Sequence, residues 1–128
     1  MRANLRRPVP VLPLEDRTRA ALRTLQAENL PEKGRTREFY FRLSEILRSH
    51  LGERYAFEAL ECTGTELVER LNRLPAPELP KEELKKFVEE SDLVKFAKME
   101  VDPSACESAL KFGFTLVERT VVAQPHVP

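Results

Sequence analysis

Several residue types are scarce in this 128-residue chain, and each scarcity excludes a class of structure. Tryptophan is absent and glycine occurs only 4 times, which disfavours a β-sandwich with its many tight turns. No stretch reaches the roughly 18 consecutive apolar residues that a membrane span requires, and none has the pattern of a signal peptide. The 10 prolines gather mainly near the two ends and in one linker, so they separate helices rather than interrupt them.

Histidine and cysteine, which could carry catalysis or bind a metal, are equally sparse, with 2 of each. The 21 Asp and Glu residues are plentiful, but pairs such as Glu82-Glu83 follow the ordinary polar face of a charged helix. Cys62 and Cys106 form no CxxC and have no histidine at metal-ligand spacing, so we expect two small buried thiols. His50 falls on a core-facing helical position without a nucleophile or acid at helical spacing, and His126 falls in the tail. A small hydrolase or transferase would need a pocket around His50. With no nucleotide-binding, metalloprotease or calcium-loop motif present, we expect no enzyme, no cofactor and no metal.

The charges that are present balance overall but not along the chain. Residues 1–55 hold 12 Lys/Arg against 7 Asp/Glu, and residues 56–128 hold 9 against 14. A domain that binds duplex nucleic acid normally carries a basic excess, which a net charge of zero does not supply. This separation of a basic first half from an acidic second half is more typical of a protein that binds other proteins.

Apolar residues at helical spacing predict two helices in the first half of the chain. Residues 14–29 form the first helix, and residues 31–35 form a turn. Thr36 is predicted to be the N-cap of the most regular helix, over 36–51, with Gly52 at its C-terminal end.

Four further segments, one of them short, have helical signals in the second half of the chain. Residues 55–61 predict a short turn or 3₁₀ piece, and Thr63 with Glu66 predicts a capping box that opens a helix to Leu74. Residues 75–80 form a proline-rich connector. A helix over 81–98 follows, and its apolar pattern shifts near Ser91 and Asp92, which indicates deep burial or a change of direction there. Asp102 before Pro103 predicts the start of a last helix that runs to about Thr120.

These segments predict an all-α fold, a compact bundle of about five main helices plus one short helix. Its single domain covers residues 14–120 and is followed by a loose tail over 121–128. The lead over 1–13 is basic and proline-rich, as expected for a segment just cytoplasmic of a membrane span, although a frayed terminus has the same composition.

The most distinctive candidate for an interaction surface lies near the end of the fourth main helix. Asp92 and Lys95 stand three residues apart and can pair on the surface. Leu93 and Phe96 cannot both face inward together with Val88 on a straight helix. Asp92, Leu93, Lys95 and Phe96 therefore form either a docking edge or a core-packing corner with one surface ion pair.

A helix-turn-helix or winged-helix regulator that binds nucleic acid is the alternative. The short helical pieces between Tyr55 and Leu74 suggest it. Against it, the candidate recognition helix would turn Glu66 and Glu69 toward the phosphates.

Three groups of motifs together resemble the cytoplasmic C-terminal region of bacterial membrane proteins of the BatD type. The groups are Arg37–Arg48, Ala59–Thr63 with Glu66-Leu67, and Asp92–Ala97. The proline-rich stretch from Pro8 is similar to the one that this family places after its membrane span, and the resemblance extends to Thr120. Gly64 stands where the family usually has a second threonine, so the match is weaker there.

The resemblance implies a membrane-tethered protein whose helical end lies at the cytoplasmic face of the bacterial inner membrane. The membrane span would then lie upstream of Met1. Proteins of this type are encoded beside MoxR-type AAA+ ATPases and von Willebrand A-domain proteins, which the resemblance makes candidate partners. It supplies no catalytic residues. We therefore expect a non-enzymatic protein-interaction module.

Overall fold

The computed structural model describes residues 12–121, and this part of the chain consists of helices and connecting segments. In chain order the elements are α1 (Leu14–Glu28), η1 (Pro31–Lys33), α2 (Thr36–Tyr55), η2 (Ala59–Glu61), α3 (Gly64–Arg73), α4 (Lys81–Phe96) and α5 (Pro103–Arg119). The predicted all-α bundle of five main helices is confirmed. Two short 3₁₀ helices accompany them, one of which, η1, lies where the sequence predicts a turn. The predicted lead and tail lie almost entirely outside the described residues.

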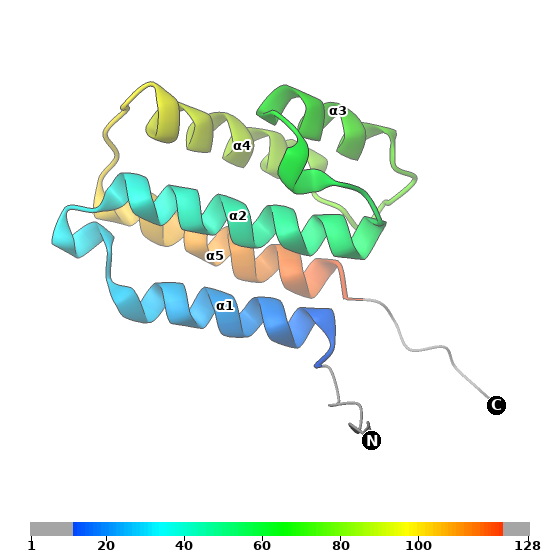
Figure 1. Ribbon diagram of the computed structural model, residues 1–128, viewed down its shortest axis with the longest axis horizontal. Coiled ribbons are helices and arrows are strands. Elements are labelled where there is room, and N and C mark those ends of the chain that lie inside the picture. The colour runs from blue at the N-terminus through cyan, green and yellow to red at the C-terminus, as the bar shows by residue number, and fades with distance from the viewer. Residues whose placement is uncertain (1–11, 122–128) are drawn as a thin grey trace, which may run out of the picture.

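Helix α2 is the centre of the bundle (Figure 1). It packs against α1 and α5, which also contact each other, and against α4 on another side. Helix α3 packs on α4 at the periphery, so it lies away from the α1–α2–α5 group (Figure 1). The start of α1 and the end of α5 lie at the same end of the bundle.

The core follows from the apolar stripes of these helices. Every main helix contributes at least two buried side chains, and the most completely buried apolar residues are Leu22, Leu25, Tyr40, Leu43, Leu47, Leu51, Leu67, Leu116 and Val117. Burying one such side chain stabilises the fold by about 1.5–3 kcal/mol. Gly113 brings α5 close to its neighbours, because a Cβ there would lie 3.3 Å from Leu22 and 3.4 Å from Leu43.

Two predicted helix starts are confirmed. Thr63 and Glu66 form a complete capping box, with Glu66 N–H donating to Thr63 Oγ1 at 3.1 Å and Thr63 N–H donating to Glu66 Oε1 at 2.9 Å. Asp102 caps α5 by accepting from the backbone N–H of Ala105 at 2.9 Å, and Pro103 occupies the first helical position. Such caps stabilise a helix by about 1 kcal/mol each.

The predicted boundaries of α2 are wrong at both ends. Thr36 is already helical, because the preceding turn closes with Gly34 in a left-handed conformation (φ 75°) and the Arg35 N–H bonded to Leu30 O. Gly52 does not end the helix, which continues to Tyr55 and stops at a left-handed Ala56. Gly52 instead leaves room for the backbone carbonyl of Phe57, which would lie 2.8 Å from a Cβ at this position.

Of the two alternatives that the sequence leaves open near Ser91 and Asp92, deep burial or a change of direction, the change of direction does not occur. Helix α4 is continuous from Lys81 to Phe96, and the chain turns back only at Lys98, whose φ is 57°. Within residues 12–121, no helix combines the length and the apolar composition needed to cross a membrane.

Candidate interaction site

The end of α4 carries the four residues for which the sequence predicts a docking edge. Phe96 and Leu93 are exposed, with 67% and 47% of their surface accessible. Asp92 is half-buried. Lys95 is buried, with only 6% accessible, so its predicted surface position is wrong, although it does pair with Asp92. Lys95 lies inward because it follows the buried Ser91 by four residues, on the inner stripe of the helix.

The Lys95 ammonium lies between α2 and α4 beneath two aromatic rings. Its Nζ donates to Ser44 Oγ at 3.2 Å and lies 4.0 Å from Asp92 Oδ1. The same nitrogen is 5.3 Å from the ring centre of Phe41 and 5.1 Å from that of Phe96. The two rings meet edge to face, with their centres 5.8 Å apart. The Lys95 ammonium is thus held by a hydrogen bond to a neutral hydroxyl and by the faces of two aromatic rings. The Asp92 carboxylate is at the longest distance that still counts as an ion pair.

A groove of about 560 Å³ opens beside this cation, and we call it the α2–α4 groove. Its walls include Phe41, Ser44 and Arg48 from α2 and Asp92, Lys95 and Phe96 from α4, and residues between 60 and 65 also line it. Burial lowers the pKa of Lys95, the charge of Arg48 lowers it further, and Asp92 opposes both. The groove therefore contains two cations close enough to repel each other.

Asp92 also contacts the start of α3. A Cβ at Gly64 would collide with the Asp92 carboxylate and lie 3.1 Å from Val88 Cγ1. The carboxylate thus sits against the first turn of α3, where the exposed N–H groups of a helix favour negative charge. Gly64 is therefore a point of close approach between α3 and the Asp92 and Val88 side chains of α4.

Three of the four predicted residues line the groove, and Leu93 does not. The α2 side was missed by the sequence analysis. Phe41 is 40% exposed, on the outer side of a helix whose other apolar residues face the core. An aromatic residue out of phase with its own apolar stripe is the signal that could have identified it.

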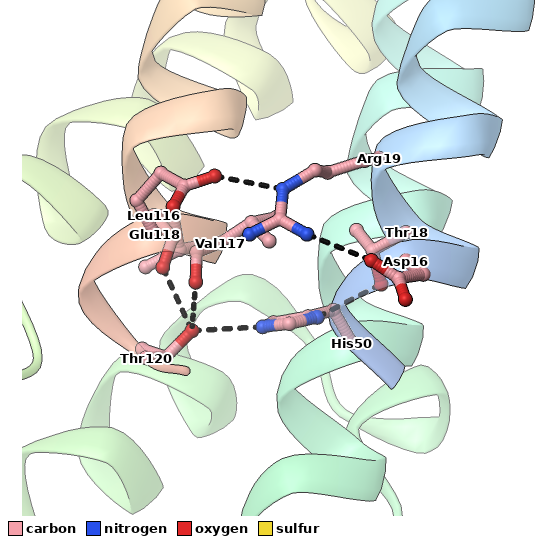
Figure 2. A network of polar contacts seen from close by, with 8 residues as sticks. All are labelled: Asp16, Thr18, Arg19, His50, Leu116, Val117, Glu118 and Thr120. Atoms are coloured by element: carbon pink, nitrogen blue, oxygen red, sulfur yellow. Dashed lines mark hydrogen bonds and ion pairs between the residues drawn. The ribbon is translucent and has the colours of Figure 1, made fainter. Parts of the chain in front are cut away.

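The predicted core position of His50 is confirmed. Its ring lies between α1 and α5, with Nδ1 2.8 Å from Thr18 Oγ1 and Nε2 2.8 Å from Thr120 Oγ1 (Figure 2). Because the Thr120 hydroxyl donates to Leu116 O at 2.7 Å, its oxygen accepts from His50 Nε2–H, and Nδ1 accepts from Thr18. Both ring nitrogens of a neutral histidine are thereby occupied. His50 also contributes to a shallow hollow between α1 and α2, but this hydrogen bonding suits a structural tie rather than acid–base chemistry.

Near His50, ion pairs also join α1 to α2 and α1 to α5. Arg19 donates to Glu118 Oε2 at 2.7 Å and to Asp16 Oδ1 at 2.9 Å (Figure 2). Arg17 forms two hydrogen bonds with Glu53, at 2.9 and 3.0 Å. These contacts are exposed, so water screens them and each contributes little to stability.

The cysteines and acidic residues form no metal centre in the described part of the chain. No group of three or more His, Cys, Asp or Glu side chains is placed to hold an ion among residues 12–121. Cys106 is buried as predicted and burial raises the pKa of its thiol, whereas Cys62 is only half-buried, and both thiols are free. The predicted outward positions of Glu66 and Glu69 on α3 are confirmed, so the alternative recognition helix carries exposed negative charge.

Comparison of the chain with protein-family models, with curated proteins and with solved structures gave no match. The resemblance to the BatD type, and the partners and location that it implies, stay predictions.

Proposed function

We propose that this chain is a non-enzymatic protein-interaction module and that the α2–α4 groove is its binding surface. The observation that carries this proposal is the pair of exposed rings, Phe41 and Phe96, in contact with each other above the buried Lys95. Aromatic residues are enriched at protein interfaces, and two of them beside a groove offer apolar area that a partner would remove from water.

We further propose, from the resemblance, that the chain is the cytoplasmic domain of a membrane-anchored protein. Its partners would be a MoxR-type ATPase or a von Willebrand A-domain protein encoded beside it. The groove supports an interaction role but is neutral on which of the two binds.

The experiment is a pull-down and titration of the purified chain with these two proteins. We expect one of them to bind, and Phe96→Ser to weaken binding by at least about tenfold, because truncation of a hot-spot residue of an interface costs about 2 kcal/mol or more. Val121→Ser is the matched control, since Val121 is also an exposed apolar residue, at 37%, but lies beyond the end of α5.

Circular dichroism of each variant verifies that the helices are retained. Equal binding by the Phe96→Ser and Val121→Ser variants would show that the groove is not the interface. Failure of both candidate proteins to bind the folded chain would count against the proposed partners. Salt-dependent binding to duplex DNA would favour the nucleic-acid alternative instead.

A further inference from the structure

The two exposed rings of the α2–α4 groove come from different helices and touch each other outside the core. Phe41 belongs to α2, and Phe96 is the last residue of α4. Their accessible fractions are 40% and 67%, and the ring centres lie 5.8 Å apart at an interplanar angle of 89°. Exposed side chains without other contacts exchange between rotamers within nanoseconds. A lasting arrangement of these two rings therefore depends on what lies beneath them.

The Lys95 ammonium lies beneath both rings. Its Nζ is 5.3 Å from the centre of the Phe41 ring and 5.1 Å from that of the Phe96 ring, within the roughly 6 Å over which a cation attracts an aromatic face. Lys95 is almost inaccessible, and this attraction is stronger where water is excluded. One cation thus attracts a ring from α2 and a ring from α4 at the same time.

Helix geometry does not by itself bring the Phe96 ring over Lys95. The two residues are adjacent in α4, and adjacent side chains on a helix point in directions about 100° apart. Lys95 faces α2, whereas Phe96 is the most exposed large apolar residue in the described part of the chain. The Phe96 ring nevertheless turns back over the Lys95 nitrogen, which indicates attraction between the two groups rather than helical register.

The position of the ammonium is itself fixed by α2. Lys95 Nζ donates to Ser44 Oγ at 3.2 Å, and Arg37 Nε donates to the Lys95 carbonyl oxygen at 2.6 Å. This carbonyl belongs to the last turn of α4, where backbone oxygens have no partner within the helix. Both the side chain and the backbone of Lys95 are thus anchored to α2, the helix that carries Phe41.

Stability alone does not account for a charge at this position. Burial and the charge of Arg48 both lower the pKa of Lys95, so the ammonium form is disfavoured here relative to water. The Asp92 carboxylate, at 4.0 Å, offsets this effect only in part. An apolar side chain of similar length would fill the same space without burying a charge.

Resting on the proposed function, we infer that Lys95 is a positioning residue whose ammonium holds Phe41 and Phe96 in one fixed arrangement before a partner binds. The partner then meets an aromatic surface that is already formed. Binding to such a surface is tighter, because the two side chains have less conformational freedom to lose. The ammonium acts through the rings and stays beneath them.

NMR spectroscopy of the full chain with ring-labelled phenylalanine tests this inference without a partner. The readout is the nuclear Overhauser effect between the Phe41 and Phe96 rings. We expect Lys95→Met, which keeps the length of the side chain and removes its charge, to reduce this effect at least about twofold. Lys95→Arg, which keeps a cation able to stack on aromatic faces, should retain it. Lys111→Met is the matched control, because Lys111 is an exposed lysine on α5.

Urea unfolding of the same variants separates positioning from a general structural role. Lys95→Met should unfold at a urea concentration equal to or above that of the wild type, because it removes a buried charge. Retained stability together with a weakened contact between the rings supports the inference. An unchanged Overhauser effect in Lys95→Met, or its loss in a stable Lys95→Arg variant, would overturn it. A weakened contact that comes with lower stability would also count against it, since the end of α4 would then have loosened as a whole.

The inference and the proposed function fail separately. For a partner that binds the groove, Lys95→Met should weaken binding by about three- to tenfold, and Lys95→Arg should keep most of the affinity. Binding that is lost with Phe96→Ser but unchanged with Lys95→Met leaves the groove as the binding surface and removes the positioning role. Rings that separate in Lys95→Met, in a chain whose partners bind Phe96→Ser as well as the wild type, leave the ring arrangement explained and remove the proposed function of the groove.

Discussion

His50 shows how one buried side chain couples three helices to pH. Its ring is almost inaccessible, and its two nitrogens bond Thr18 of α1 and Thr120 at the end of α5. Burial lowers the pKa of His50 to about 4, and the charge of Arg54 contributes. The folded chain therefore holds this histidine neutral over the range in which an unfolded chain would protonate it, near pH 6.5.

We expect the free energy of unfolding to fall as the pH is lowered through 6.5 toward 4. In this range the unfolded chain binds a proton at His50 and the folded chain does not, so protonation favours unfolding. The contribution between pH 7 and pH 5 is about 2 kcal/mol. Urea unfolding followed by circular dichroism at pH 7, 6 and 5 measures it.

His50→Gln is the matched variant, because an amide can both donate and accept hydrogen bonds but does not titrate. It should be less stable than the wild type at pH 7 and lose less stability between pH 7 and pH 5. Parallel loss in the two proteins would mean that other groups carry the pH dependence.

At the scale of the element, the junction of α3 with α4 depends on the absence of a side chain at Gly64. In an unobstructed helix, alanine would be favoured over glycine by up to about 1 kcal/mol. Here a Cβ would collide with the Asp92 carboxylate and press on Val88.

We therefore expect Gly64→Ala to lose the stabilisation of up to about 1 kcal/mol that alanine otherwise gives, because the Asp92 carboxylate must turn away and Val88 must shift. Asp92→Ala should relieve most of this loss in the double variant, because it removes the obstructing carboxylate. A double-mutant cycle from urea unfolding measures the coupling. Additive effects of the two substitutions would show that the carboxylate is not the obstacle.

At the scale of the whole molecule, the five helices are not equally supported. Helices α1, α2 and α5 pack on one another, and α2 also packs on α4, whereas α3 has its main helix contact with α4 (Figure 1). An opening of α3 alone would expose the buried Leu67 and Leu71 and would leave the contacts among α1, α2 and α5 in place.

We expect the amides of α3 to exchange with solvent by local opening, at a free energy about 1–2 kcal/mol below that of α2. Native-state hydrogen exchange followed by NMR measures this, with the amides of Leu71 in α3 and Leu47 in α2 as the comparison. Equal protection of these two amides, with the same urea dependence, would show that α3 opens only with the whole bundle.

The sequence by itself determined the helices and most of their starts. The capping box of Thr63 and Glu66 and the Asp102 cap involve residues three positions apart, so their signals are complete within one turn of the chain. The same reasoning placed His50 in the core, because a helix repeats its inner face every three to four residues.

Only the tertiary structure decided where α2 ends, that Lys95 is buried, and that Phe41 and Phe96 form one surface. Gly52 resembles a helix terminator in the sequence, but its role depends on the carbonyl of Phe57, which approaches to within 2.8 Å of where a Cβ would lie. Lys95 was expected at the surface because a charged residue rarely lies inside. Its burial requires Ser44 and two aromatic rings, one of them supplied by α2. Such contacts join segments some 50 residues apart. They depend on the angle at which two helices pack, and the residue pattern within one helix does not encode that angle.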